Sequence, residues 1–571
     1  MSTVAELGRG VRHARRTWSR TQTLTAALVA LIAVLPALGF GFVHVDALAG
    51  WLYLALAASA LVLPVGFAGL PSLAQGAFMA IGALTTAVLG AHAGWAPMAA
   101  LPVALVVSVL AGLLTGLAVV RLPPVFVAVS TWLLTWLVAL AATEFSWLSG
   151  GAQGYVAGSP LTPTAHYELA LALTVAVIGL LAVFRASPAG LRLRAVRDDA
   201  AAAAVLGVPG DRLRYGAFVV AAGIAGVAGA LTVQLAGVSD PDAFGPQESF
   251  RLLAAVLIGG AGYAAAGAVG VGVLGVLSLI AHVWGSVLGD APAQIEPMLT
   301  AVLLLVVLGL GRGGIGAALA ARFARRRPRP DVATPPAGEP RPAAVQARGV
   351  AKAYGGLRAL DGLDLDVAPG EAIALVGANG SGKTTALRAL GGALVADDGQ
   401  LLIDGRALSG GPDAHARAGV VRTLQRTAVF GSLTALESVV VGAALHARHS
   451  GPLRAVASTP KARAEAPLLR GAALEALREV GLEDVAHEPA DRLDSFQRRR
   501  LMLAAALAAR PRLLLLDEPS AGAAPAELPR LAHILRRVQA SGVSIVLVEH
   551  NQKLVAAVAD RVLTMTDGRV R

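Results

Sequence analysis

A glycine-rich loop carries the clearest chemical signal in the sequence. Residues 377–384 read Gly-Ala-Asn-Gly-Ser-Gly-Lys-Thr and fit the pattern G-x-x-x-x-G-K-[ST]. Glycines let backbone N–H groups close around phosphate oxygens, and a helix that starts at the loop adds its positive end. We therefore predict a nucleotide site in which Lys383 reaches the β- and γ-phosphates and the Thr384 hydroxyl is a ligand of Mg²⁺. The other predicted phosphate contacts are Gly377, Asn379, Gly380, Ser381, Gly382 and Thr385.

Two carboxylates end a second apolar run, about 130 residues after this loop. The run 513–516 predicts a buried strand, and Asp517 and Glu518 follow it. Asp517 suits an indirect or water-mediated contact to Mg²⁺, and Glu518 suits a base or a polariser for the attacking water. A third apolar run, 544–548, comes shortly before His550, for which a purely structural role is the alternative. The order of the three motifs predicts that His550 contacts the γ-phosphate.

These residues need an α/β domain to position them. The apolar run 372–376 predicts a buried strand before the glycine-rich loop, and 385–390 has the composition of a helix after it. From residue 343 onward apolar and charged residues alternate, as in a soluble α/β domain. We expect this domain to cover 343–571, after a linker at 321–342 that is rich in Pro and Arg and cannot form a core.

The preceding part, 1–320, has the composition of a membrane domain. The 571-residue chain is 55% hydrophobic and 15% charged, against about 25% charged in a typical soluble protein. A wholly soluble or disordered protein is thereby excluded, and the lack of cysteine excludes thiol, disulfide and zinc–thiolate chemistry. We predict an all-α polytopic domain with about ten spans, at 24–43, 48–67, 73–90, 97–120, 123–143, 167–184, 216–236, 251–262, 265–288 and 297–311. Gly259, Gly260 and Gly262 predict a break within the membrane between the eighth and ninth spans.

Arginine is concentrated on one predicted side of these spans. Five arginines precede the first span, and the predicted inner loops are Arg-rich, whereas the predicted outer loops carry acids and Arg251 as their one base. By the positive-inside rule both termini are expected in the cytoplasm. The net charge of +11 then comes from inner loops, linker and domain surface. No nucleic-acid partner is expected, because aromatic residues do not interleave with the basic ones.

On these motifs, residues 343–571 resemble the ATP-binding domain of the ABC transporter family. The resemblance implies an ATP hydrolase with ATP and Mg²⁺ as cofactors. It implies that Tyr354 stacks on adenine and that Gln425, in the run 422–426, links Mg²⁺ and water to the membrane contact. The residues 520–525 occupy the position of the family's D-loop.

One family motif is degenerate. The signature, usually LSGGQ or LSYGQ, reads Leu-Asp-Ser-Phe-Gln at 493–497; a one-residue gap restores Ser495 as its serine but not the glycines, and Gln497 remains. In the family this segment caps the γ-phosphate bound by the opposite subunit. We expect Asp494 to repel that phosphate and Phe496 to block close backbone approach. The resemblance therefore implies an asymmetric heterodimer, in which this chain's catalytic residues act with the signature of a second ATPase subunit.

Residues 40–310 resemble the permeases of branched-chain amino acid uptake systems. The segment 66–83 is similar to their G-x-x-G-x-x-S-x-G-x-x-A-F-x-x-I-G-A motif, with Ala74 in place of a glycine. Close helix packing explains such small residues without a substrate contact. The segment 187–208 resembles their cytoplasmic coupling segment and is expected to dock near Gln425. The run 422–437 is similar to the matching ATP-binding subunits.

Together the two resemblances imply a permease–ATPase fusion in a bacterial cytoplasmic membrane. It would import branched-chain or related hydrophobic amino acids with a second permease, a second ATPase and an extracytoplasmic binding protein. Two alternatives stay open: a nucleotide-gated or regulatory membrane subunit with little hydrolysis of its own, and an importer of urea or short amides. An exporter is disfavoured because ten spans exceed the usual six of an exporter half.

Overall fold

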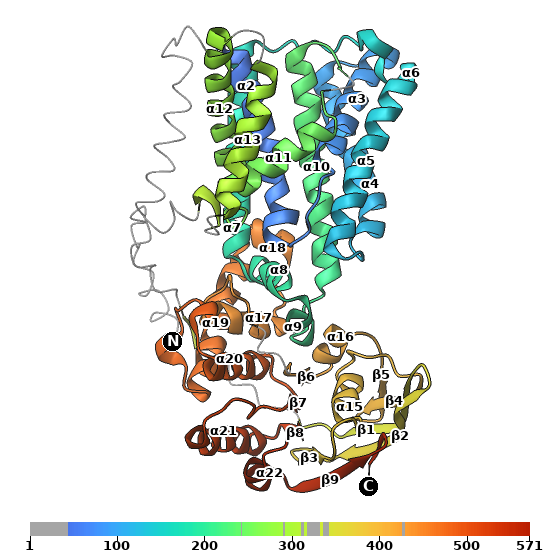
Figure 1. Ribbon diagram of the computed structural model, residues 1–571, viewed down its shortest axis with the longest axis vertical. Coiled ribbons are helices and arrows are strands. Elements are labelled where there is room, and N and C mark those ends of the chain that lie inside the picture. The colour runs from blue at the N-terminus through green and yellow to red at the C-terminus, as the bar shows by residue number, and fades with distance from the viewer. Residues whose placement is uncertain are drawn as a thin grey trace, which may run out of the picture.

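The computed structural model has a helical part and an α/β part, with two short helices between them (Figure 1). It describes residues 44–240, 243–288, 292–309, 313–316, 332–334, 342–424 and 429–570. The first predicted span, 24–43, and nearly all of the predicted linker, 321–342, lie outside the described residues.

The other nine predicted spans all correspond to helices in the described residues. Their bounds are α2 Val45–Leu61 continued by the π-helix η2 Val62–Phe67, α3 Gln75–Ala93, α4 Pro97–Val119, α5 Pro124–Glu144, α7 Pro163–Ala186, α10 Gly210–Ala236, α11 Pro246–Gly259, α12 Ala266–Leu288 and α13 Pro292–Gly309. The short elements α6 Ser146–Ser149 and η3 Gly151–Gln153 lie between α5 and α7.

The described helices differ in how well their length and composition fit a membrane span. Six described elements, α2 with η2, α3, α4, α5, α7 and α10, are long and apolar enough to cross a membrane. The 14 residues of α11 rise only about 21 Å, which is less than a bilayer core of about 30 Å. Helices α12 and α13 have 23 and 18 residues, and the apolar stretches described within them are Ala266–Ala281 and Ile295–Gly309.

Small residues bring two of the helices into backbone contact. A Cβ on Gly82 of α3 would lie 1.9 Å from the carbonyl oxygen of Gly226 in α10, and one on Gly229 would lie 2.0 Å from that of Met79. Accordingly 67% of the apolar window of α10 is buried, against 28% for α4 and 22% for α5 and α7. Helix packing thus accounts for this end of the 66–83 motif, as predicted.

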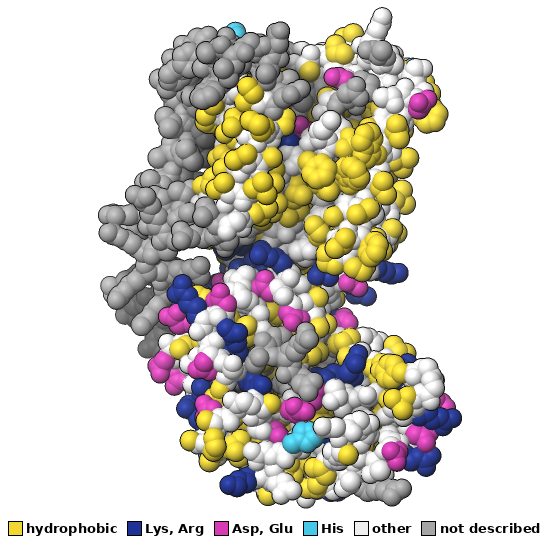
Figure 2. All heavy atoms as spheres, in the orientation of Figure 1, with side chains coloured by type: hydrophobic (Ala, Val, Ile, Leu, Met, Phe, Trp, Pro, Cys, Tyr) yellow, Lys and Arg dark blue, Asp and Glu magenta, His cyan; other side chains and the backbone are white. Residues whose placement is uncertain are grey.

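The less buried helices carry a broad apolar surface. Figure 2 shows hydrophobic side chains over the helical part and charged side chains of both signs over the α/β part. On α4 and α5 the exposed large side chains include Leu110, Leu114, Val125, Phe126 and Leu137. A surface of this kind suits lipid tails or another apolar helix rather than water.

Charged side chains join the last three helices of this part. Arg251 of α11 lies 3.0 Å from Glu296 of α13 and 3.8 Å from Glu248, one turn away in α11. Glu296 also accepts a hydrogen bond of 2.8 Å from Ser278 of α12. These three charged residues were expected in outer loops; they lie instead within helices, because α11 and α13 begin earlier than the predicted eighth and tenth spans.

The α/β part contains two sheets. The larger has the strand order β10-β9-β3-β8-β7-β6, in which β9, β3, β8, β7 and β6 run parallel. Their bounds are β3 Ala372–Val376, β6 Val420–Arg422, β7 Leu513–Asp517, β8 Ser544–Val548, β9 Arg561–Thr566 and β10 Arg569–Val570. The smaller, antiparallel sheet has the order β2-β1-β4-β5, with β1 Val345–Tyr354, β2 Leu357–Val367, β4 Asp398–Ile403 and β5 Arg406–Leu408.

Helices surround these sheets and contact the helical part. They are α15 Lys383–Leu390, α16 Pro412–Arg417, α17 Ala435–Ala443, α18 Pro452–Val456, α19 Pro460–Glu479, α20 Ser495–Ala508, α21 Leu528–Ala540 and α22 Gln552–Val558. Two connecting helices, α8 Pro188–Asp198 and α9 Ala200–Val205, bury Leu191, Val196 and Leu206 in one core with Val439 of α17. The segment predicted to couple the two parts therefore packs on the α/β part.

Candidate active site

The glycine-rich loop lies between β3 and α15, as its pattern predicted. Gly377, Gly380 and Gly382 have φ values of +153°, +84° and +102°, which L side chains rarely adopt. A Cβ on Gly377 would lie 2.3 Å from the carbonyl oxygen of Met565, and one on Gly382 would lie 2.4 Å from that of Ala359. Glycine is thus required by conformation and by space, and the backbone can approach a ligand closely.

Lys383 is the first residue of α15, and its side chain is almost fully buried. Its ammonium donates to the carbonyl oxygens of Gly377 at 2.9 Å and Ala378 at 2.7 Å. Ser381 is buried as well, Thr384 and Thr385 are half-buried, and Asn379 is exposed. A cation enclosed by the loop, at the start of a helix, fits the phosphate groups of a nucleotide.

Strand register brings the other predicted residues to the same edge of the sheet. Val548 of β8 pairs with Leu375 of β3 on one side and with Asp517 of β7 on the other. The residues that follow these strands, namely the glycine-rich loop, Glu518 and His550, therefore leave the sheet side by side. Ligands bind at this carboxyl edge of parallel strands in α/β folds.

Asp517 is buried and paired on one side only. Its Oδ2 accepts a hydrogen bond of 2.9 Å from Arg422 of β6, whereas its buried Oδ1 has no partner among the described residues. Burial raises the pKa of Asp517, and the hydrogen bond from Arg422 opposes that rise. Mg²⁺ prefers oxygen ligands such as carboxylates and hydroxyls. The unpartnered oxygen of Asp517 and the hydroxyl of Thr384, in the first turn of α15, could therefore hold the ion.

Glu518 adopts a left-handed backbone conformation at φ +47°, which is uncommon for a residue with a side chain. Its N–H donates to the carbonyl oxygen of Val548 at 2.9 Å, which fixes the turn. Its Oε1 lies 3.6 Å from Nε2 of His550, and both side chains are partly exposed. Backbone strain of this type is common at functional sites. The pair could orient and deprotonate a water molecule.

A further acid in this region was not singled out from the sequence. Glu549 is 4% exposed, and its carboxylate accepts backbone N–H groups of Ser520, His550 and Asn551 at 3.1, 2.9 and 3.0 Å. It ties the turn after β7 to the turn after β8. In the sequence, Glu549 is visible only as an acid directly after an apolar strand. Its role becomes clear only once β8 is known to pair with β7.

Two residues implied by the family resemblance lie at the margin of this site. Tyr354 ends β1 and is exposed, with the ammonium of Lys352 5.9 Å from its ring centre. It belongs to the β1–β2 hairpin whose Ala359 contacts the glycine-rich loop, so an exposed ring is available for stacking. Gln425 lies outside the described residues.

The degenerate signature begins helix α20. Asp494 is its N-cap and accepts the N–H of Gln497 at 2.8 Å, while the Gln497 side chain accepts the N–H of Asp494 at 3.1 Å. Ser495 is exposed. Phe496 is only 7% exposed and stacks under Arg500 at 4.8 Å. Phe496 was expected to block close backbone approach; its ring is buried against Arg500, whereas Asp494 is exposed at the surface.

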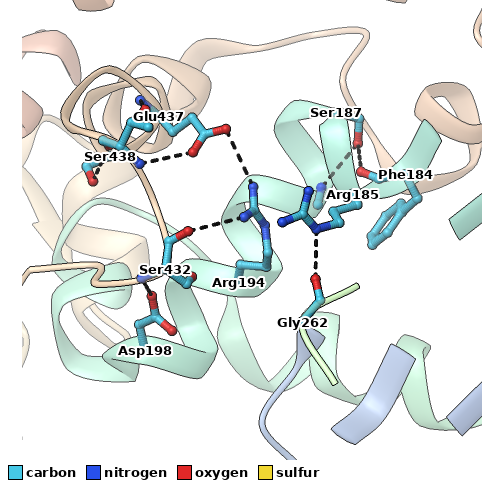
Figure 3. Close-up of polar contacts among 11 residues, drawn as sticks. Phe184, Arg185, Ser187, Arg194, Asp198, Gly262, Ser432, Glu437 and Ser438 are labelled. Atoms are coloured by element: carbon cyan, nitrogen blue, oxygen red, sulfur yellow. Dashed lines mark hydrogen bonds and ion pairs between the residues drawn. The ribbon is translucent and has the colours of Figure 1, made fainter. Parts of the chain in front are cut away.

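Helix α8 joins the α/β part through polar contacts as well. Arg194 donates to the carbonyl oxygen of Ser432 at 3.4 Å and lies 3.8 Å from Glu437, the residue that closes the capping box of α17 (Figure 3). Asp198 accepts the N–H of Ser432 at 2.7 Å. Burial, and repulsion from nearby Arg185, lower the pKa of Arg194 to about 10, so it stays a cation at neutral pH.

Comparison with known proteins supports both halves of this description. Residues 44–308 match the family described as the permease component of the branched-chain amino acid transport system, and residues 360–521 match the ABC transporter family. The α/β part is similar to "High-affinity branched-chain amino acid transport ATP-binding protein BraF" of Pseudomonas aeruginosa, with 33% identity over 39% of this chain and 88% of that protein.

Two further relatives of the α/β part differ in their stated cargo. LivG of Escherichia coli, a protein with the same description, is 33% identical over 39% of this chain and 88% of its own length. The cobalt import ATP-binding protein CbiO of Rhodobacter capsulatus is 36% identical over 38% of this chain and 72% of its own length. Because the relative named for cobalt is as similar as those named for amino acids, the α/β part alone does not determine a cargo. The chain belongs to the ABC transporter family and joins a permease domain of the branched-chain amino acid transport type to a nucleotide-binding domain whose ATP hydrolysis is coupled to transport.

Proposed function

We propose that this protein imports branched-chain or related hydrophobic amino acids across a bacterial cytoplasmic membrane. The observation that carries the proposal is the permease match over residues 44–308, since the membrane domain contacts the cargo. The BraF and LivG similarity of the α/β part agrees with it. In this proposal the helical part is a multi-pass domain, roughly residues 1–320, and both termini are cytoplasmic.

Hydrolysis is assigned to the residues at the carboxyl edge of the larger sheet. Lys383 and the backbone of the glycine-rich loop bind the phosphates, and Tyr354 stacks on the adenine. Glu518 takes a proton from the attacking water while His550 positions that water against the γ-phosphate. Thr384, Asp517 and Gln425 would hold Mg²⁺, which supplies charge neutralisation on the phosphates.

A second ATPase subunit is part of this proposal, because Asp494 places a carboxylate where the family presents a neutral signature. In a dimer that segment faces the ATP of the opposite subunit, so this chain weakens its partner's site rather than its own. The competent site would combine the glycine-rich loop of this chain with the signature of the second subunit. A second permease and an extracytoplasmic binding protein complete the importer.

Uptake by the assembled transporter tests this function. Cells or vesicles that contain it should take up leucine, isoleucine or valine in a saturable manner. Lys383→Ala should abolish uptake together with ATP binding, because the buried ammonium is lost from the loop. Uptake of urea and short amides without hydrophobic amino acids would contradict the cargo, and uptake that survives Lys383→Ala would contradict the energy source.

A regulatory membrane subunit is the second candidate, and the capped signature helix is the observation that favours it. A subunit of this kind would bind ATP without turning it over. Steady-state hydrolysis by the purified chain, with and without the second ATPase, separates the two functions. An importer with one competent site requires hydrolysis that depends on Glu518 of this chain when the second ATPase is present.

A further inference from the structure

Two interruptions of the permease helices lie directly against each other. The first begins where η2 ends and runs through Gly69, which has a φ of +70°, to the start of α3. The second is the turn 260–265 between α11 and α12. A Cβ on Gly66 would lie 1.9 Å from the carbonyl oxygen of Ala261, so the two backbones touch where only glycine fits. We call residues 66–69 and 260–263 together the joint.

Arginines from three other helices bind the carbonyl groups of the joint. Arg197 of α8 donates to the carbonyl oxygen of Gly66, and Arg214 of α10 donates to that of Ala68 at 3.3 Å. Arg185, at the end of α7, donates to the carbonyl oxygen of Gly262 at 2.8 Å (Figure 3). Carbonyls at helix ends lack partners within their own helix, and cationic donors satisfy them well.

The side chain of Arg197 also packs on the joint through its stem. A Cβ on Gly69 would lie 3.0 Å from Cγ and 3.3 Å from Cα of Arg197, so the backbone of α8 lies against this glycine. Within about one and a half turns, Arg192 and Arg194 of the same helix donate to carbonyl oxygens of Ser450 and Ser432 in the α/β part. Within the described residues, α8 thus binds the α/β part and the joint at the same time.

We propose that the joint is the element of the permease that responds to ATP, and that Arg197 is the positioning residue that transmits the response from α8. The inference rests on the proposed function of an ATP-driven importer. A displacement of Ser432 or Glu437 moves α8, because the buried Arg194 and the carboxylate of Asp198 hold α8 there. Arg197 then moves the carbonyl end of η2, and the contact between Gly66 and Ala261 passes that motion to α11 and α12.

The physical basis is that the joint has few of the constraints of a continuous helix. Backbone groups at a helix interruption rely on external donors, so a donor that moves changes which conformation is favoured. A π-helix such as η2 is rare and marks a place where a helix departs from regular hydrogen bonding. A continuous helix, with its regular backbone hydrogen bonds, would resist the same displacement.

A single-cysteine reporter tests this inference, since the chain has no cysteine of its own. The reporter is Ala264→Cys, at the partly buried residue that directly follows the joint in the turn 260–265. The transporter is assembled in nanodiscs in a Glu518→Gln background, which binds ATP without hydrolysing it. The rate of labelling by a water-soluble maleimide is measured with and without Mg-ATP, and ATP binding and thermal unfolding are measured on the same samples.

We expect ATP to change the labelling rate, and Arg197→Gln to reduce that change by about fivefold or more while ATP binding is retained. Arg197→Met keeps the apolar stem but removes the donors, so it should behave like Arg197→Gln even if the latter folds poorly. Arg212→Gln is the matched control, at an exposed arginine of α10, and should leave the ATP-dependent change intact.

Two results overturn the inference while leaving the proposed function standing. One is an ATP-dependent change in the Arg197 variants equal to that in Arg212→Gln. The other is a labelling rate that does not respond to ATP in the unsubstituted reporter, although that protein binds ATP. If Lys383→Ala leaves ATP binding unchanged, the proposed nucleotide site itself is wrong, and that failure is distinct from both.

Discussion

Two helices of the α/β part begin where ABC proteins contact phosphate, and they begin differently. Helix α15 starts after Gly382, which has no side chain and so leaves the first turn without a side-chain cap. Helix α20 starts at Asp494, whose carboxylate closes a capping box with Gln497. The first end is open to an anion and has Lys383 beside it, whereas the second is already neutralised by an anion of its own.

The difference shows that the N-terminus of a helix can serve either to bind a ligand or to stabilise the helix. An uncapped helix start leaves N–H groups available for a ligand, at some loss of stability. A capped start stabilises the helix by about 1 kcal/mol and removes those groups from use. In the proposed dimer, the first arrangement belongs to this chain's own nucleotide site, and the second faces the site of the opposite subunit.

Removal of the base at the open site should have the largest effect on rate. Glu518→Gln keeps the size of the side chain but cannot accept a proton, so we expect hydrolysis to fall about 10²–10⁴-fold with ATP binding retained. Steady-state phosphate release and nucleotide binding by the assembled transporter measure the two quantities. Glu483→Gln, at an exposed acid in the same domain, is the control, and an equal loss in both variants would contradict the assignment.

The stability of the larger sheet, at the edge that carries the nucleotide site, depends on one buried ion pair. Arg422 and Asp517 are 6% and 0% exposed, so Arg422→Ala leaves a buried carboxylate unpaired. We expect the free energy of unfolding of the α/β part to fall by about 3–5 kcal/mol. Calorimetric unfolding of the full chain measures it. Arg417→Ala removes the half-exposed pair with Asp413 and should cost under about 1 kcal/mol; similar losses would show that burial does not matter here.

Glu549 should position the turns of the open site without binding ATP. Glu549→Gln retains one acceptor oxygen but replaces the other with an amide nitrogen that repels the backbone N–H groups. We expect kcat for hydrolysis to fall about tenfold, which equals about 1.4 kcal/mol. The dissociation constant for ATP should stay unchanged, because Glu549 does not touch the glycine-rich loop in this arrangement. A weaker ATP affinity at unchanged kcat would contradict this positioning role.

Substitution of Asp494, the N-cap of α20, should have the smallest effect, because a single charge at an exposed surface is screened by solvent. Asp494→Ser keeps an N-cap of similar quality but removes the negative charge that, in the proposed dimer, faces the opposite ATP. About 1 kcal/mol of repulsion is relieved, so ATP-dependent association between two copies of the chain should strengthen about fivefold. Light scattering or mass photometry with and without ATP measures it. Asp491→Ser, on the preceding turn, should have no effect; equal effects would exclude a local role for Asp494.

Local pattern was enough to predict the elements of the α/β part. The glycine-rich loop, the strands before it and before Asp517, and nine helices of the helical part all depend on local spacing. The short helix α11, of 14 residues, lies where the sequence has its shortest predicted span, 251–262. The break after Gly259 was predicted, since clustered glycines are a local signal.

Contacts between distant segments account for what the sequence did not predict. The pairing of Arg422 with Asp517 depends on β6 lying next to β7, and the three hydrogen bonds of Glu549 depend on the order of β7 and β8. The contact of Gly66 with Ala261 joins segments nearly 200 residues apart. The inward turn of Phe496 was missed because the motif shows residue type but not direction. The catalytic roles of Glu518 and His550 stay predictions.

A mixing experiment tests the asymmetry of the two helix starts most directly. One chain carries Glu518→Gln with Asp494→Ser, so its own catalysis is lost and its signature is relieved of the negative charge. The other is the unaltered chain, with its catalytic residues intact and its signature capped by Asp494. We predict that an equimolar mixture hydrolyses ATP faster than either chain alone, because only the mixed dimer joins an intact catalytic site to a signature without the Asp494 charge. A mixture that is no faster than the unaltered chain would contradict the account.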